Sequence, residues 1–476
     1  MSAPYATARK MLDDLACRRI SALELLEQHV ALQRSHHGKL NAVITEDLET
    51  ARTAARALDD ARVRGVELGV LAGLPMTIKD GFDVSGMPAT AGNPEFSARE
   101  RSCADADLVG RLRSAGAVIW GKTNVPLMLG DFQSYNAVFG TTNNPFDLSR
   151  TSGGSSGGAA AALAADITPL ELGSDIGGSL RHPANFCGVC ALKPSWGALP
   201  LKGHIPPSPG MNQEIDLNVA GPMARNVKDL KLMWDVLRGQ PVTEPRPAAQ
   251  ARIAVWNAQP GWPLAQCVKD AVEQTAKCLS DLGFPVDYAV PDFNADALLQ
   301  NYLDLLIATV ATNFPAHLRD AMAARREDDI RLVSESRDVT GEARYRLRAS
   351  ATEEQLDAAR RKRNNYKRVL DGFFRQGYDA ILAPVTPVTA FLHDHSAPMT
   401  ARTLLVDGIA APYMSALNWI SVATALHAPA LVLPAARHAG LPIGVQLIGP
   451  QGGESRLFEV ALAAELAIGP FPPPKL

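Results

Sequence analysis

The chain of 476 residues is long enough for one large domain or several smaller ones, and 46% hydrophobic with 20% charged residues is the composition of a protein with a buried core. The net charge of −3 comes from intermixed acidic and basic residues, which disfavours a general binding surface for nucleic acid or an anionic membrane. Six cysteines are too few for a disulfide framework and indicate a reduced, intracellular protein.

The first 64 residues are predicted to form a helical flank. Acidic residues stand in the first 20 positions, where a secretory signal needs an apolar block, so we expect a cytoplasmic protein. Ser21 and Glu24 form the pattern of a capping box and predict the start of a helix. Residues 46–64, rich in Ala, Arg and Asp, predict a second helix.

Helix and strand signals alternate from residue 65 onward. Strands are expected at 74–78, 117–120, 169–172, 253–256, 284–290, 380–384, 430–433 and 443–448. Helices are expected at 105–115, 266–282 and 454–468. This alternation predicts an α/β fold with a largely buried central sheet.

Two regions differ in composition from the rest. Residues 320–376 are charged and helical in pattern, and their interspersed Arg, Glu and Asp favour a solvated helical subdomain over a nucleic-acid arm. Residues 408–436 contain no Lys, Arg, Asp or Glu, but prolines, Asn418 and His427 interrupt them, which favours buried core over a membrane span. We divide the chain into a flank of 1–64, a core of 65–240, an α/β and helical variable region of 241–377, and a C-terminal part of the core of 378–476.

Residues 151–183 form an unusual stretch, TSGGSSGGAAAALAADITPLELGSDIGGSLRHP. A flexible linker would stay polar on both sides, whereas residues 159–165 predict a helix. Glycines at a helix N-terminus suit an anion. However, the stretch contains no G-x-x-x-x-G-K-[ST], and residues 144–150 before it are typical of a loop and not of a strand. The sequence therefore disfavours a phosphate cradle.

Two short motifs here have weak functional interpretations. Residues 153–157 match the G-x-S-x-G nucleophile elbow, but an elbow needs a preceding strand and a histidine base, and His182 is more plausibly incidental. Cys187 and Cys190 form a C-x-x-C without a second pair of metal ligands. Buried small side chains explain these cysteines better than a redox pair or half a zinc site.

A serine hydrolase without histidine needs another base, and Lys79 is a candidate. It follows the apolar residues 74–78 directly, so we expect its amine to be desolvated. To be neutral near pH 7, a lysine must lower its pKa by roughly 3 units. Gly177 and Gly178 stand directly before Ser179, where small residues let backbone N–H groups converge on a substrate carbonyl as an oxyanion hole.

Together these motifs resemble the amidase signature family. The signature itself matches residues 153–197, from GGSSGG to KPSWG. Further matches are GLPMTIKD at 73–80, TNVPLMLGDFQSYNAVFGTTNNPFD at 123–147, GPMARNVKDL at 221–230, DAILAPVTPV at 379–388 and GLPIGVQLIGP at 440–450. The resemblance implies a large mixed central β-sheet covered by helices on both faces, with a helical subdomain.

The resemblance also implies a Ser–cis-Ser–Lys triad. Lys79 matches the base, Ser155 the bridging serine with a cis peptide bond, and Ser179 the nucleophile of an amide hydrolase that forms an acyl-enzyme. Two further sets match: Ser156, Asp175 and Arg181 as supporting residues, and the amides of Ile176, Gly177, Gly178 and Ser179 as the oxyanion hole. Such chemistry requires no metal and no cofactor.

The sequence defines the substrate less well. Residues 125–131 resemble fatty acid amide hydrolase-like members, and Met128, Leu129 and Phe132 are candidates for an apolar pocket or for core packing. We expect a small-molecule amide, ester or carbamate as substrate and no nucleic acid or membrane span, with a homodimer left open.

Two alternatives remain. One is the glutamine-hydrolysing A subunit of an aminoacyl-tRNA amidotransferase. Residues 197–221 depart from that subunit's usual passage, and no Arg/Asp pair stands out to hold the charged ends of glutamine. The other is an inactive binding scaffold with the same fold, which the presence of Lys79, Ser155 and Ser179 disfavours.

Overall fold

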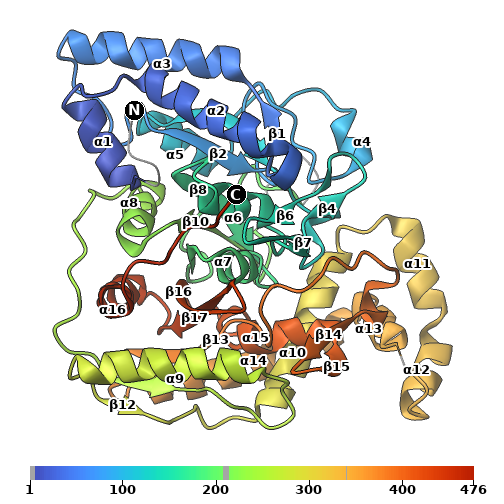
Figure 1. Ribbon diagram of the computed structural model, residues 1–476. Coiled ribbons are helices and arrows are strands. Elements are labelled where there is room, and N and C mark those ends of the chain that lie inside the picture. Colours follow the sequence, from blue (N-terminus) through green and yellow to red (C-terminus); the bar gives the residue numbers. More distant parts are fainter. Residues whose placement is uncertain (1–5, 207–213, 339) are drawn as a thin grey trace.

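A mixed sheet of eleven strands forms the centre of the computed structural model, which describes residues 6–206, 214–338 and 340–476 (Figure 1). The strands are β1 (Val43–Glu46), β2 (Pro75–Lys79), β3 (Val118–Thr123), β8 (Leu170–Asp175), β9 (Cys190–Lys193), β10 (Val219–Ala224), β11 (Ile253–Val255), β12 (Val286–Asp287), β13 (Ala380–Pro384), β16 (Ala430–His438) and β17 (Leu441–Ile448). Their order is β1-β3-β2-β8-β10-β9-β16-β17-β13-β11-β12. β2 pairs in parallel with β3 and β8, whereas the strands from β8 to β13 pair antiparallel.

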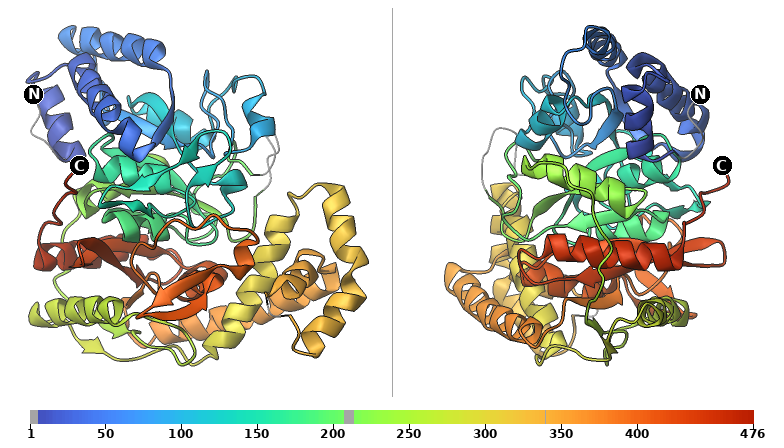
Figure 2. Two further views of the ribbon diagram at one scale, coloured as in Figure 1. Left: turned by 45° about the vertical axis from the view of Figure 1, so that its right-hand side comes forward. Right: turned by 90° about the vertical axis from the view of Figure 1, so that its left-hand side faces the viewer.

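Helices cover both faces of this sheet, as predicted (Figure 2). Side chains alternate along β16: Leu431 and Leu433 belong to one core cluster, while Ala430 and Val432 belong to the other. One layer contains α5 (Asp107–Ser114), α8 (Val227–Arg238), α9 (Gln266–Asp281) and α16 (Glu454–Ile468). On the opposite face α7 (Arg181–Cys187) packs on β9, β16 and β17 beside α6 (Gly157–Ala164).

The N-terminal flank contains α1 (Ala8–Ala16), α2 (Ala22–Leu40) and α3 (Leu48–Val63). The predicted capping box is confirmed, since Ser21 Oγ accepts from the Glu24 amide at 3.1 Å and the Glu24 carboxylate accepts from the Ser21 amide at 2.9 Å. The flank is not purely helical, because β1 joins the central sheet as its edge strand. β11 and β12 of the variable region join the same sheet, so all four stretches of the chain contribute to it.

The helical pattern predicted for residues 320–376 is also confirmed. These residues form α11 (Ala316–Ala324), α12 (Arg326–Ser334), α13 (Glu342–Ala349) and α14 (Glu353–Phe374), and α10 (Ala295–Ala311) precedes them; Figure 1 shows these helices beside the sheet. α10 contacts α13 and α14 on one side and α15 (Asn418–Ala425) of the core on the other. It therefore joins the subdomain to the middle of the protein.

Short elements complete the fold. They are α4 (Pro94–Ser97), the 3₁₀ turns η1 (Leu127–Leu129), η2 (Met399–Ala401) and η3 (Tyr413–Leu417), and the hairpins β4 (Tyr135–Asn136) with β5 (Gly140–Thr141), β6 (Asn143–Asn144) with β7 (Asp147–Thr151), and β14 (Thr403–Val406) with β15 (Ile409–Pro412).

Some expectations for single elements are wrong. Residues 144–150 are not simply a loop, because β7 pairs with β6, although this ladder stands apart from the central sheet. Of the strand expected at 284–290, only the two residues of β12 are paired.

Residues 408–436 are mostly core in α15 and in the first half of β16, but Ile409 in β15 is exposed. Within the described part of the chain, no helix has the length and apolarity to cross a membrane.

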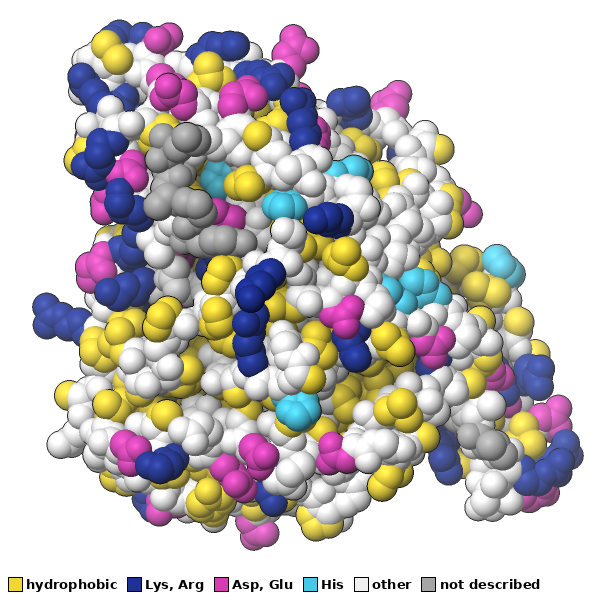
Figure 3. All heavy atoms as spheres, viewed as in Figure 1, with side chains coloured by type: hydrophobic (Ala, Val, Ile, Leu, Met, Phe, Trp, Pro, Cys, Tyr) yellow, Lys and Arg dark blue, Asp and Glu magenta, His cyan; other side chains and the backbone are white. Residues whose placement is uncertain are grey.

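The molecular surface mixes charges of both signs. On the face shown in Figure 3, Lys and Arg side chains alternate with Asp and Glu, and they do not gather into one basic patch. This agrees with the small net charge of −3. The absence of a nucleic-acid partner stays a prediction.

Candidate active site

Lys79 is the last residue of β2 and is fully buried, with 0% of its surface exposed. All five residues of this strand are buried, since β2 lies between β3 and β8 and α2 and α6 contact it. The Lys79 Nζ lies 2.8 Å from Ser155 Oγ, 3.0 Å from Ser174 Oγ and 3.3 Å from the Ser174 carbonyl oxygen. Two serines therefore supply the polar contacts of the amine among the described residues.

This environment shifts the pKa of the lysine. Burial lowers the pKa of Lys79 to about 7, although the nearby Asp175 and Glu171 carboxyls oppose the shift. Burial also raises the pKa of Glu171 to about 8, while Thr77 donates a hydrogen bond to its carboxyl group. At neutral pH Glu171 is therefore mostly protonated, and a substantial fraction of Lys79 is neutral.

Ser155 lies in the turn between β7 and α6, with 1% of its surface exposed. The peptide bond between Gly154 and Ser155 is cis, as the family resemblance implied. A Cβ atom at Gly154 would clash with the carbonyl oxygen of Asp131, so only glycine fits where these two backbone segments meet. The turn that presents Ser155 is therefore packed against residues 131–133.

Ser179 stands between β8 and α7, with 6% of its surface exposed. The amide of Ser156 donates to the Ser179 carbonyl at 3.1 Å, and Ser156 Oγ donates to the Ser174 carbonyl at 3.4 Å. Ser156 thus joins the loop of Ser155 to the loop of Ser179. Within the described ranges, no direct hydrogen bond connects Ser155 Oγ with Ser179 Oγ.

The loop before Ser179 presents free backbone amides. Among the described residues, the N–H groups of Ile176, Gly177 and Ser179 have no hydrogen-bond acceptor. The fourth amide of the implied oxyanion hole differs, because Gly178 N–H donates to Asp175 Oδ1 at 2.9 Å. Gly178 has a φ of +90°, and a Cβ there would lie 2.6 Å from the His182 ring, so glycine is required. Three amides, and not four, are left for an oxyanion.

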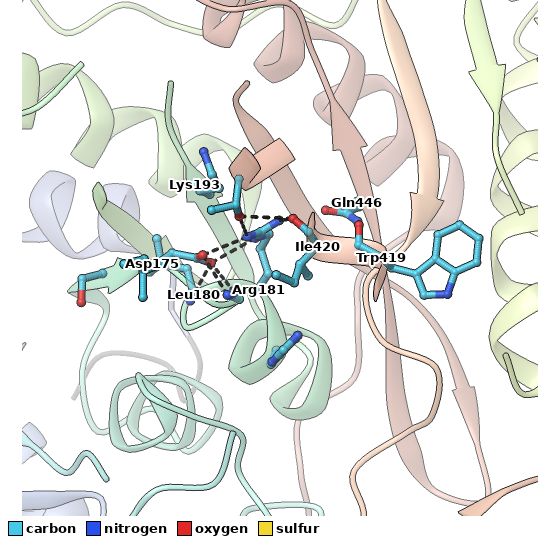
Figure 4. A network of polar contacts seen from close by, with 12 residues as sticks. Asp175, Leu180, Arg181, Lys193, Trp419, Ile420 and Gln446 are labelled. Carbon is cyan, nitrogen blue, oxygen red and sulfur yellow. Dashed lines mark hydrogen bonds and ion pairs between the residues drawn. The ribbon is translucent and has the colours of Figure 1, made fainter. Parts of the chain in front are cut away.

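Asp175 and Arg181 brace this loop from inside the protein (Figure 4). Arg181 donates to both carboxylate oxygens of Asp175, at 3.0 and 2.9 Å, and to the carbonyl of Ile420 in α15 at 2.9 Å. Asp175 also accepts from the Leu180 amide at 3.1 Å. Burial alone would raise the pKa of the Asp175 carboxyl, but the Arg181 guanidinium holds it well below its usual range.

Known proteins share this architecture along almost the whole chain. The family model described as Amidase matches residues 24–458. The A subunit of glutamyl-tRNA(Gln) amidotransferase from Salinispora arenicola is 32% identical over 96% of both chains, and indoleacetamide hydrolase of Bradyrhizobium diazoefficiens is 32% identical over 94% of this chain and 84% of its own. The crystal structure of an amidase superposes with a TM-score of 0.81 at 28% identity, covering 98% of this chain and 100% of that one.

The chain belongs to the amidase signature family. With indoleacetamide hydrolase among its relatives and an amidase among its structural neighbours, it is an amide-hydrolysing enzyme. A bacterial aryl acylamidase of the same family shares the fold, with a TM-score of 0.79 at 24% identity.

The amidase places its candidate pocket residues in two environments. Met128 and Leu129 are partly buried and pack on an apolar cluster that includes Phe96 and Ile205. Phe132 is buried in the main core, with its ring 5.2 Å from the rings of both His182 and Tyr413. Contact with a substrate stays a prediction for all three residues.

Ser174 is a site residue that the sequence did not single out. It lies in β8, beside the glycine-serine motif, and its Oγ and carbonyl oxygen both contact Lys79. A serine inside an apolar strand was the available signal, but only the pairing of β8 with β2 brings it to the amine.

Three other sequence interpretations concern His182, the two cysteines of the C-x-x-C motif and residues 197–221 of this chain. His182 Nε2 lies 3.1 Å from the Ala416 carbonyl oxygen, and among the described residues the ring makes no hydrogen bond to Ser155 or Ser179; burial lowers its pKa to about 4. Cys187 and Cys190 are buried free thiols, as expected. Of the segment 197–221, residues 207–213 lie outside the described residues.

Replacing Arg181 with methionine is expected to destabilise the amidase by about 3–5 kcal/mol at neutral pH, because Asp175 would keep a buried charge without its partner. Urea unfolding of the two proteins measures this difference. Since Asp175 has a lowered pKa in the folded state, the wild-type advantage should shrink as the pH falls below about 4.

The exposed pair Arg331–Asp328 provides the matched control, and Arg331→Met should change stability little. Equal effects of Arg181→Met and Arg331→Met would contradict the bracing role of Arg181.

Proposed function

We propose that this amidase cleaves amide C–N bonds through an acyl-enzyme on Ser179, with Lys79 as the base and Ser155 as the proton relay. The observation that carries the proposal is the buried Lys79 amine, which lies 2.8 Å from Ser155 Oγ and has a pKa of about 7. A group that titrates near the working pH is suited to general-base catalysis.

The contacts of Lys79 are compatible with a proton transfer from Ser155 to the amine. A neutral amine has two N–H donors and one lone pair, and the Ser174 carbonyl can only accept an N–H. With the two N–H groups directed to the carbonyl and the hydroxyl oxygens of Ser174, the lone pair of the amine is left for the Ser155 hydroxyl, which can then accept the proton of Ser179. This step needs a contact between Ser155 and Ser179 that forms with substrate bound, as catalytic hydrogen bonds often tighten in the complex.

The reaction then follows in two halves. Ser179 Oγ bonds to the substrate carbonyl carbon while its proton passes to Ser155 and the Ser155 proton to Lys79. The amides of Ile176, Gly177 and Ser179 stabilise the developing oxyanion. The relay returns a proton to the leaving amine as the C–N bond breaks. Water then attacks the acyl-enzyme while its proton passes through Ser155 to Lys79, and the relay returns this proton to Ser179 Oγ as the acyl–oxygen bond breaks, which releases the acid and restores Ser179.

An apolar small-molecule substrate agrees best with the surroundings of the site. Leu129 lies beside Gly81, two residues beyond Lys79, since a Cβ at Gly81 would be 3.0 Å from the Leu129 side chain, and Met128 precedes Leu129 in η1. These two side chains are the proposed apolar wall, with Phe132 supporting it from the core. Amides, and also esters or carbamates, with an aryl or long alkyl group are the proposed substrates. The cytoplasmic location and a homodimer remain expectations.

A substrate panel tests this wall. Because burial of each CH₂ contributes about 0.8 kcal/mol, kcat/KM for a butyl- or aryl-substituted amide should exceed that for acetamide on the order of 100-fold. Met128→Ser should reduce this preference and leave acetamide turnover nearly unchanged. If acetamide were the better substrate, the apolar wall would be discarded.

A glutamine-hydrolysing subunit is the second candidate, because relatives at 32% identity carry the name of the A subunit of glutamyl-tRNA(Gln) amidotransferase. The α-carboxylate and α-ammonium groups of glutamine need free opposite charges. Arg402 and Arg363 are already engaged in ion pairs, Arg402 with Asp131 and Arg363 with Asp216. Ammonia release from glutamine, measured alone and with added partner subunits, distinguishes the candidates. Efficient release would favour the glutamine-hydrolysing role.

A further inference from the structure

Tyr302 contacts the active-site loop from outside the segments that carry the family motifs. It lies in α10 of the variable region and is fully buried, with 0% of its surface exposed. Its hydroxyl donates to the carbonyl oxygen of Ile176 at 2.7 Å. Burial raises the pKa of this hydroxyl well above its usual range, so it keeps its proton.

The position of that carbonyl determines where a neighbouring N–H points. The Ile176 carbonyl and the Gly177 N–H belong to the same peptide plane, which is trans because the cis bonds of the described chain lie elsewhere. In a trans peptide the two groups point in opposite directions. A hydrogen bond that holds the Ile176 oxygen toward Tyr302 therefore holds the Gly177 hydrogen on the opposite side.

The α-carbon of Gly177 is loosely packed. A Cβ built at Gly177 would find its nearest atoms at 3.6 Å in Leu417 and 4.0 Å at the Tyr302 hydroxyl, so the glycine has space around it. The next amide is held differently, since Gly178 N–H is tied to Asp175. A glycine with open surroundings rotates easily unless a hydrogen bond restrains its peptide.

We propose that Tyr302 is a positioning residue that orients the Gly177 N–H toward the oxyanion of the transition state. The inference rests on the proposed acyl-enzyme at Ser179. The inference gives the variable region a part in catalysis, because Tyr302 lies in α10. This helix also packs against α13 and α14 of the same region. The donated hydrogen bond additionally polarises the peptide, which strengthens the N–H on its far side as a donor.

Tyr302→Phe tests the inference by removing the hydroxyl and keeping the ring. We expect kcat to fall by about 10- to 100-fold with KM within about twofold, since loss of an entire oxyanion donor costs about 100- to 1,000-fold. An aryl boronic acid, which forms a tetrahedral adduct on the serine, should bind more weakly by a similar factor. Tyr366→Phe is the matched control, because its ring packs on Phe293 in the same region, and it should leave both values unchanged.

The outcomes separate this inference from the proposed function. A wild-type kcat and boronate affinity in Tyr302→Phe would overturn it, and so would a rise in KM alone, which indicates substrate contact. If Tyr302→Phe does not fold, 4-aminophenylalanine and 4-chlorophenylalanine at position 302 fill the space with and without a donor. Equal kcat values for these two would overturn the inference. Retained turnover in Ser179→Ala would instead refute the proposed function itself.

Discussion

Ser179→Ala is expected to abolish amide hydrolysis, with a loss in kcat of at least about 10⁴-fold, while the protein stays folded. The physical reason is the loss of the oxygen that bonds to the substrate carbonyl; the oxyanion amides and the binding surface remain and give only residual catalysis. The change removes one hydroxyl from a side chain with 6% exposure, and among the described residues its Oγ makes no structural hydrogen bond. Steady-state hydrolysis and a thermal melt measure the two effects.

Ser149→Ala is the control for this experiment, since Ser149 is an exposed serine whose Oγ donates to Asp147 away from the site. Turnover by Ser179→Ala near the wild-type rate would refute the nucleophile. A wild-type protein that neither turns over amides nor reacts with a fluorophosphonate would support the inactive scaffold.

Lys79→Met is expected to lower kcat/KM by about 10²- to 10⁴-fold at neutral pH, the usual contribution of a general base. Methionine keeps much of the volume of the lysine but cannot accept a proton, so Ser155 loses the acceptor that its proton transfer requires. The loss in kcat/KM should be greater for the amide, which has the poorer leaving group, than for an activated aryl ester. Hydrolysis of both substrates by Lys79→Met measures this difference.

Lys193 is a matched control for Lys79, because the two lysines lie in similar environments. It is also buried, burial lowers its pKa to about 7, and its Nζ donates to the carbonyls of Pro194 and Ala428, both at 2.8 Å. Lys193→Met removes a comparable buried amine without touching the serines, so kcat should change far less than in Lys79→Met. Equal losses in the two variants would indicate that both act through stability, and Lys79 would not be the base.

Local patterns were sufficient to predict eight of the eleven strands of the central sheet and several of its helices. The closing helix at 454–468 was predicted at its observed bounds, and the helix at 266–282 to within a residue, since each is long and amphipathic. The strands β9 and β10 were not expected: β9 is short, and the glycine and proline within β10 hide its strand signal. β1 was taken for part of a helical flank, although it pairs with β3 far along the chain.

The residues of the candidate site also divide into those that local motifs predict and those that depend on contacts between distant segments. Lys79, Ser155 and Ser179 lie in motifs that identify themselves in the sequence, and the structure brings Lys79 to Ser155. The role of Ser174 could not be predicted, because its contact with Lys79 depends on how the strands pair. The engagement of the Gly178 amide with Asp175 could not be predicted either, because it depends on the conformation of the loop. Tyr302 comes from a helix more than a hundred residues away along the chain, so no local pattern could relate it to Ile176.

The rate of fluorophosphonate labelling at Ser179 as a function of pH tests most directly whether a neutral Lys79 activates the nucleophile. The reagent bonds to Ser179 Oγ through phosphorus and releases fluoride, and peptide mapping confirms the labelled residue. In the wild type the rate should rise about tenfold per pH unit and level off near the Lys79 pKa of about 7, whereas Lys79→Met should label slowly without this titration. An unchanged rate and pH profile in Lys79→Met would contradict the account.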